Sequence, residues 1–258
     1  MEIRLTGRKA LVTGGSKGLG LAIARTFAEA GADVAIMARR QGPLDEAVAV
    51  IGSRPGQQVL PIVCDVRRAE DITAGFARVT QALGRVDILV NNAGTSNAHP
   101  FETVTDAQWQ EDIDLKLFAA IRLIRLAWPQ MRERRWGRII NVLNIGAKAP
   151  RPASAPTSVT RAAGMALTKV LAGEGAPQGI LVNALLVGFI ESDQWVQRAA
   201  KAGVPLKDLL AQMGKEIPIG RVGTAQEFAN AACFLASDVA SYITGTAINV
   251  DGNRSPVV

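Results

Sequence analysis

The sequence is poor in the residues that build metal sites and disulfide frameworks. Among its 258 residues are two cysteines and one histidine. Cys64 and Cys233 lie inside apolar runs without the spacing of metal ligands, so we expect two buried free thiols in a reducing cytoplasm and no bound metal. We expect the single histidine, His99, on a loop surface; the alternative is an acid near neutral pH.

Long hydrophobic runs are also missing. Hydrophobic residues make up 48% of the chain, enough for a sizeable core, yet no run reaches the roughly 18 apolar residues that a membrane-spanning helix needs. The N-terminal stretch MEIRLTGRKALVTGG has no apolar segment followed by a small-residue cleavage site. We therefore expect a cytoplasmic protein without a membrane partner.

The positive charge is not gathered into a nucleic-acid-binding surface. The formal net charge is +6, but the arginines are scattered. Their densest cluster, Arg132, Arg134 and Arg135, closes a helical stretch, where the helix dipole favours positive charge. An anionic cofactor or substrate accounts for the remaining excess, and we expect no nucleic-acid partner.

Short β-branched runs alternate with longer helical stretches along the whole chain. This alternation predicts a single α/β domain over residues 1–258, a Rossmann-type doubly wound parallel sheet of about seven strands with helices on both faces. The expected strands are residues 9–14, 33–38, 58–64, 86–92, 137–143, 179–186 and 246–250, and the expected helices are residues 18–30, 42–51, 68–83, 106–135, 157–174 and 224–237.

Two segments interrupt this regular alternation. Residues 149–158, APRPASAPTS, contain three prolines between a strand and a helix, and we expect an ordered loop over the site. Residues 189–223 form one long insertion before the last helix, and long insertions often act as lids over a binding site.

A glycine-rich turn follows the first expected strand and opens a helix. Glycines permit a tight turn and close backbone approach, and a helix N-terminus offers free N–H groups to a pyrophosphate. The strand before and the helix after favour a dinucleotide site over a merely structural turn. The residues predicted to bind there are Gly14, Ser16, Lys17, Gly18, Leu19 and Gly20.

The spacing of this turn is TGxxxGxG, and other stretches follow it in a familiar order. They are NNAG at 91–94, CDV at 64–66, ILVN at 180–183, IPIGRVG at 217–223, FLASD at 234–238 and YITGTAINVDG at 242–252. With them the chain resembles the short-chain dehydrogenase/reductase family over essentially its full length. The resemblance implies a nicotinamide cofactor held also by Asp65, Val66, Asn91, Ala93, Gly94, Gly188, Ile190 and Ser192.

The choice of dinucleotide follows from charge at the end of the second strand. An acidic residue there binds the ribose hydroxyls of NAD and repels a 2′-phosphate. Here the strand ends in Arg39 and Arg40, and Lys17 lies where the NADP-preferring members of the family carry a basic residue. We therefore predict that NADP(H) is preferred over NAD(H), with Arg39 and Lys17 binding the phosphate.

The family's Asn-Ser-Tyr-Lys tetrad is replaced at all four positions. Aligned by the surrounding motifs, the chain has Lys116, Asn144, Thr157 and Arg161 there, the last two within SAPTSVTRAAGMALTK. The only tyrosine, Tyr242, lies in the C-terminal stretch. A threonine hydroxyl is a far weaker acid than a phenol, and arginine stays protonated, so neither takes over the usual proton transfer.

We predict that Lys116 belongs to a replacement site. A neighbouring Arg161 lowers the pKa of the Lys116 ammonium and makes it an acid or base, while Thr157 and Asn144 orient a substrate and Arg161 binds a carboxylate or oxyanion. The alternative is that Lys116 faces solvent or forms an ion pair with Asp112 one turn earlier.

Three functions remain open at this point. The first is an NADP(H)-dependent oxidoreductase for a small carbonyl or alcohol, the second a catalytically silent NADP-binding sensor or assembly protein, and the third a lyase or isomerase. Polar residues at every vacated position favour the first. Lys148 and Arg151 contact either an anionic substrate or solvent. The apolar helices 106–135 and 157–174 predict a homo-oligomer, a tetramer or a dimer.

Overall fold

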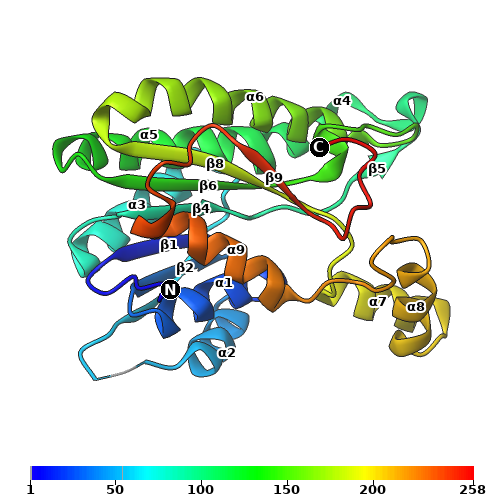
Figure 1. Ribbon diagram of the computed structural model, residues 1–258, viewed down its shortest axis with the longest axis horizontal. Coiled ribbons are helices and arrows are strands. Elements are labelled where there is room, and N and C mark those ends of the chain that lie inside the picture. The colour runs from blue at the N-terminus through cyan, green and yellow to red at the C-terminus, as the bar shows by residue number, and fades with distance from the viewer. Residues whose placement is uncertain (1, 54) are drawn as a thin grey trace.

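A sheet of parallel strands runs through the molecule in the computed structural model, which describes residues 2–53 and 55–258 (Figure 1). The strand order of this seven-stranded sheet is β3-β2-β1-β4-β6-β8-β9. Each expected strand is present, with ends shifted by no more than one or two residues. The bounds are β1 Lys9–Thr13, β2 Asp33–Ala38, β3 Val59–Val63, β4 Ile88–Asn91, β6 Gly137–Asn144, β8 Ile180–Val187 and β9 Ala247–Val250.

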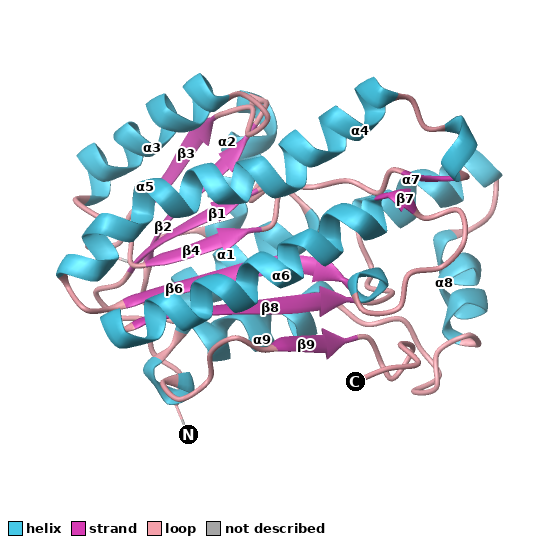
Figure 2. Ribbon diagram, turned by 90° about the horizontal axis from the view of Figure 1, so that it is seen from above, coloured by secondary structure: helices cyan, strands magenta, loops and turns pink. Residues whose placement is uncertain are grey.

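Helices cover both faces of the sheet (Figures 1 and 2). On one face lie α1 Gly18–Glu29, α2 Gln41–Ile51 and α9 Ala225–Ala236, whose apolar sides share one buried cluster with β1 and β2. On the other lie α3 Ala69–Leu83, α5 Ala119–Glu133 and α6 Thr157–Gly175, which share a second cluster. The strand order reverses between β1 and β4, and ligands bind at such a switch point, outside the carboxyl ends of the strands.

The expected helix 106–135 is not uniform. It consists of α4 Asp106–Ile113, a π-helical turn η2 Asp114–Phe118, and α5. The N–H of Ala119 donates to the carbonyl of Asp114, five residues earlier, which is the hydrogen bond of a π turn. The extra residue in this turn changes which side chains face the interior beyond α4. A pattern search at the α-helical period does not detect such a turn.

The two irregular segments both fold back over the carboxyl ends of the strands. The proline-rich loop carries β7 Ala155–Pro156, which pairs antiparallel with β5 Ala98–His99. These strands are too short for a sequence period, and the sequence did not predict them. The long insertion holds α7 Asp193–Ala202 and α8 Leu206–Gly214, which lie at that same end in both views (Figures 1 and 2). Short helical turns complete the chain at η1 Phe101–Thr103, η3 Ile145–Ala147, η4 Ala176–Gln178 and η5 Asp238–Ala240.

Both cysteines are buried and free, as expected. Burial raises the pKa of Cys64 to about 12 and that of Cys233 to about 11, so both thiols stay protonated near neutral pH. Among the described residues, no helix has the length and apolar character needed to cross a membrane.

Candidate active site

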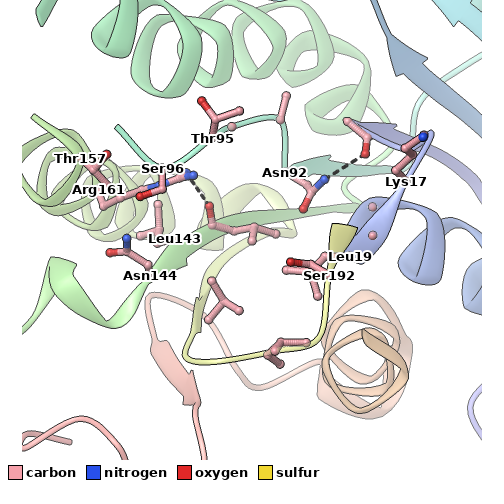
Figure 3. A pocket seen from close by; sticks show the side chains of 18 of the residues that line it. Lys17, Leu19, Asn92, Thr95, Ser96, Leu143, Asn144, Thr157, Arg161 and Ser192 are labelled. Carbon is pink, nitrogen blue, oxygen red and sulfur yellow. Dashed lines mark hydrogen bonds between the residues drawn. The ribbon is translucent and has the colours of Figure 1, made fainter. Parts of the chain in front are cut away.

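Two adjoining pockets lie outside the carboxyl ends of the strands. The first, of about 320 Å³, lies between the glycine turn, the ends of β4 and β6, and the segment after β8 (Figure 3). The second, of about 360 Å³, lies beyond the ends of β2 and β3. Gly14, Lys17, Ala93 and Gly94 line both, so the pockets form one continuous groove.

The glycine turn forms a backbone cradle at the start of α1. Gly14 and Gly18 have positive φ angles of 64° and 54°, which glycine adopts without strain. A Cβ atom on Gly20 would lie 2.2 Å from the carbonyl oxygen of Gly14, so a side chain does not fit there. Lys17 precedes the helix without a side-chain cap, and no acidic residue lies in the first turn of α1. The N-terminal N–H groups of α1 are therefore available to a phosphate.

Most of the other predicted cofactor residues line the groove. Arg39 and Lys17 are exposed beside the second pocket, which also contains Arg40 and Arg67. The predicted residues on the first pocket are Gly18, Leu19, Gly20, Ala93, Gly94, Gly188, Ile190 and Ser192, and those on the second include Ser16, Asp65 and Val66. Asn91 lies outside both: its amide is buried and donates to Oδ1 of Asn141 at 2.9 Å, joining β4 to β6.

The sequence did not predict that Asp65 has a partner of its own. Arg67 donates from Nε at 3.0 and 3.1 Å and from Nη2 at 2.6 Å to the carboxylate of Asp65. This ion pair holds the pKa of Asp65 below its usual value. The carboxylate stays ionised at the edge of the groove with its charge balanced, so it opposes an incoming phosphate less than a free carboxylate does.

Three of the four predicted catalytic residues line the first pocket. Thr157 begins α6, Arg161 follows one turn later, and Asn144 ends β6; all three lie on one side of the pocket, opposite Lys17 (Figure 3). Lys116 lies behind this wall, with its side chain fully buried. Its ammonium donates to the hydroxyl oxygen of Thr157 at 2.9 Å.

A chain of hydrogen bonds positions this lysine. The Lys116 ammonium also pairs with Oδ1 of Asp112, and the hydroxyl of Thr160 donates to Oδ2 of the same carboxylate at 2.7 Å. The N–H of Asn97 donates to the Thr157 oxygen at 2.9 Å. Thr157 therefore accepts two hydrogen bonds, and its own proton remains to be donated.

The environment of Lys116 combines both alternatives that the sequence left open. The ion pair with Asp112 is present, but the ammonium also reaches the wall of the pocket, and it is not exposed to solvent. The pKa of Lys116 is lowered to about 8: burial is the largest cause, the hydrogen bond and charge of Asp112 oppose it, and the charge of Arg161 adds to it. A lysine with this pKa exchanges its proton near neutral pH.

Arg161 and Asn144 each keep an unpaired polar atom beside the pocket. Nη1 of Arg161 donates to the carbonyl of Val142 at 2.8 Å, while its Nε is buried without a partner among the described residues. Burial lowers the pKa of Arg161 to about 10, and Asp112 opposes this shift. Oδ1 of Asn144 is likewise buried and unpaired. Buried polar atoms without partners are costly, so both residues are suited to binding a polar ligand.

Some residues of the site were not predicted from the sequence. Thr160 lies three residues after Thr157, at the spacing that places two side chains on one side of a helix. Thr95, Ser96 and Trp195 also line the first pocket, but the segments that carry them have no regular pattern. His99 is exposed and lines neither pocket, in agreement with a surface position, but it lies on β5 and not in a loop.

Comparison with known proteins agrees with this geometry. Residues 14–252 match the family model described as enoyl-(acyl carrier protein) reductase. An acetoacetyl-CoA reductase from Rhizobium meliloti (strain 1021) is 39% identical over 247 residues, which are 96% of this chain and 98% of that protein. The structure of L-sorbose reductase from Gluconobacter frateurii with NADPH and L-sorbose aligns over 100% of both chains, with a TM-score of 0.95 and 36% identity.

A second related structure also has an unusual catalytic site. It is an NADPH-bound short chain oxidoreductase from Pseudomonas aeruginosa PAO1 that contains an atypical catalytic center, with a TM-score of 0.91 and 38% identity over 99% of each chain. The family model covers most of the chain, and these relatives match it almost from end to end. The chain therefore belongs to the short-chain dehydrogenase/reductase family of oxidoreductases.

Proposed function

We propose that the protein is an NADP(H)-dependent oxidoreductase that interconverts a small carbonyl compound and its alcohol. The observation that carries this proposal is the buried Lys116 ammonium, which donates to the Thr157 hydroxyl at the wall of the pocket. When bound, the nicotinamide supplies or accepts the hydride. The chain itself must then supply or accept one proton at the substrate oxygen, and Thr157 with Lys116 is suited to this task.

The groove fits an NADP-type dinucleotide. The Gly14–Gly20 turn offers backbone N–H groups to the pyrophosphate, and Lys17 with Arg39 offers positive charge to a 2′-phosphate. The related structures from Gluconobacter frateurii and Pseudomonas aeruginosa contain NADPH, which supports the same preference here.

In the direction of reduction, the Thr157 hydroxyl donates its proton to the developing substrate oxyanion. Lys116 returns a proton to the Thr157 oxygen in the same step, so that no free threonine alkoxide accumulates. The net result is a neutral Lys116 and a substrate alcohol; in oxidation the proton moves the other way. The Asn144 amide donates to the substrate oxygen, and the Arg161 guanidinium stabilises its negative charge.

The test replaces Lys116 with methionine, whose unbranched side chain is one atom shorter and carries no ammonium. Consumption of NADPH is followed by nicotinamide absorbance over a panel of small ketones and aldehydes. We expect Lys116→Met to lower turnover by about 10²–10⁴-fold, the usual contribution of a positioned acid. NADPH affinity should stay within about twofold, because Lys116 does not line the groove. Lys207→Met, at an exposed position of α8, is the matched control.

Three results would contradict the proposal. Normal turnover by Lys116→Met removes the lysine from the mechanism. Tight NADPH binding by the wild type without turnover of any panel compound supports a silent binding protein. Product formation without a change in nicotinamide absorbance supports a lyase or isomerase. Because Lys116→Met leaves Asp112 unpaired, thermal unfolding of the variant and of Lys116→Met with Asp112→Asn checks that both are folded.

A homo-oligomer, a tetramer or a dimer, is part of the same proposal. Apolar side chains are exposed at and beside α5 and α6: Phe118 is 41% exposed, Val159 55% and Val170 58%. Burying them between subunits removes apolar area from water. A monomer in light scattering at micromolar concentration would contradict this.

A further inference from the structure

A smaller pocket next to the proposed substrate site is lined by two arginines. Its volume is about 140 Å³, and its walls include Arg151, Arg254, Ser154, Ser158 and Gly146. We call it the arginine pocket. None of the described residues that line it is acidic, so its positive charge is not balanced from within the pocket.

Arg254 is held in place but only partly paired. Its side chain is 10% exposed, its guanidinium lies 3.7 Å from the centre of the Phe189 ring, and Nη2 is 3.3 Å from the carboxylate of Glu216. Glu216 is 64% exposed, so water weakens this ion pair. The Nε of Arg254 is buried and has no partner among the described residues. A fixed, largely dehydrated arginine with an unpaired N–H is suited to binding an anion.

The second arginine of the pocket is Arg151. Of the two nearby basic residues, Lys148 and Arg151, it is the one whose side chain can bind a ligand. Lys148 donates to the carbonyl of Ala247 at 2.6 Å and thereby joins the loop to β9. Arg151 is exposed, and its guanidinium has no ion pair among the described residues. The loop and the C-terminal tail that carries Arg254 meet beyond the carboxyl ends of β6 and β9 (Figure 1).

The arginine pocket is the immediate neighbour of the proposed substrate site. Ile145 and Ser158, which line it, directly follow Asn144 and Thr157, which line the first pocket. Between them lies Gly146. A Cβ atom on Gly146 would lie 2.7 Å from the hydroxyl oxygen of Ser158 and 3.1 Å from Oδ1 of Asn144. The walls of the two pockets are therefore in contact around Gly146.

We propose that the arginine pocket binds an anionic group of the substrate, a carboxylate or a phosphate ester, several bonds away from the reacting carbonyl carbon. This inference rests on the proposed function, because it assigns the reacting carbonyl to Thr157 and Asn144. Arg254 and Arg151 donate to the anion, and the Ser158 hydroxyl is a further donor. The substrate class is then a keto acid or keto phosphate with its charge remote from the carbonyl.

The first experiment compares substrates that differ in charge alone. NADPH-dependent kcat/KM is measured for a ketone with a remote carboxylate, its methyl ester, and a ketone of similar length with a phosphate ester. We expect the wild type to prefer the charged compounds by about 10–100-fold, the range of charge-assisted hydrogen bonds. The relative rates of carboxylate and phosphate distinguish the two anions.

Variants then assign the preference to the pocket. Arg151→Gln should lower kcat/KM for the charged compounds by about tenfold, mainly through KM, and leave the methyl ester unchanged. Arg132→Gln removes one arginine at an exposed position outside the pocket and should change neither. Arg254→Lys keeps the charge but loses the forked donor geometry, and it should lower the preference for the charged compounds by a smaller factor.

A binding measurement separates this inference from the proposed function. The keto acid and its methyl ester are titrated calorimetrically into the full-length wild type and into Arg151→Gln. Tighter binding of the acid by the wild type, lost in Arg151→Gln, supports the arginine pocket even if no compound is turned over. Equal binding of acid and ester by the wild type overturns the inference. Equal kcat/KM for both in an active enzyme overturns it also, and leaves the proposed function intact.

Discussion

The cofactor half and the catalytic half of the groove use different parts of the chain. In the cofactor half, the Gly14–Gly20 turn presents backbone N–H groups. The charged side chains of this half, Lys17 and Arg39, are exposed. In the proposed catalytic half, the candidate residues are side chains, and the Lys116 ammonium lies buried behind Thr157. A backbone site tolerates changes in most of its side chains, whereas a buried charge network depends on each member. The following predictions test this difference.

Among changes in the cofactor half, the largest effect is expected where the backbone cradle has no room. Gly20→Ala places a Cβ 2.2 Å from the carbonyl oxygen of Gly14, so the turn must move. Overpacking of about 3 kcal/mol corresponds to about 100-fold weaker NADPH binding in calorimetric titration. Gly42→Ala in α2 is the control, since a Cβ there has no atom within 4 Å. Unchanged affinity in Gly20→Ala would show that the cradle does not bind the cofactor.

Exposed charged side chains in the cofactor half should determine the preference between NADP(H) and NAD(H) without affecting the stability of the fold. In the wild type, NADP(H) should bind more tightly than NAD(H), because Lys17 and Arg39 lie beside the second pocket. Arg39→Asp combined with Lys17→Ala should reverse the preference and weaken NADPH binding by about 10–100-fold. Thermal unfolding should be nearly unchanged, as both side chains are exposed. Equal affinity of the wild type for both dinucleotides is the contrary result.

The pH profile distinguishes the catalytic half from the cofactor half. The pKa of Lys116 is lowered to about 8, so the ammonium form dominates below pH 8. In the proposed mechanism, reduction consumes the proton of Lys116. The rate of reduction should therefore be constant at lower pH and fall about tenfold per pH unit above 8, while the rate of oxidation rises through the same range. Asp112→Asn removes the charge that raises this pKa, and the midpoint should move to lower pH. NADPH affinity should not change with pH at the midpoint of the wild type or at that of Asp112→Asn. A reduction rate that is constant up to pH 10 would exclude Lys116 as the acid.

The smallest effect is expected at Thr160, which is linked to Lys116 through Asp112. Thr160→Val keeps the shape of the side chain but removes the hydroxyl that donates to Asp112 at 2.7 Å. Loss of one such hydrogen bond costs about 1 kcal/mol, which predicts a turnover reduced by about fivefold and a lower unfolding temperature. Thr73→Val on α3, whose hydroxyl donates only to a backbone carbonyl of its own helix, serves as the control. A Thr160→Val enzyme with a shifted pH midpoint and unchanged NADPH affinity would place Thr160 in the Lys116 network.

The predicted cofactor-binding residues differ in how far their roles depend on residues close to them in the sequence. The turn at Gly14 and Gly18 needs positive φ angles and a following helix, and both requirements are visible within a few residues of sequence. Asn91 was assigned to the cofactor by resemblance, but its amide joins β4 to β6 across 50 residues of chain. Local sequence contains no information on such a contact.

The family resemblance alone assigned Lys116, Asn144, Thr157 and Arg161 to the tetrad positions. By itself, the sequence determined the parallel sheet, the glycine turn and the basic end of β2. These follow from apolar periodicity, glycine conformation and residue charge, which act over short stretches of chain. Tertiary structure alone decided that Lys116 meets Thr157 across 41 residues, and that Arg151 and Arg254 line one pocket. The π turn, the β5–β7 pairing and the fold of the C-terminal tail set those contacts. The physical reason is that a buried charge takes its pKa and its role from the groups packed around it, and packing brings together parts of the chain that are far apart in sequence.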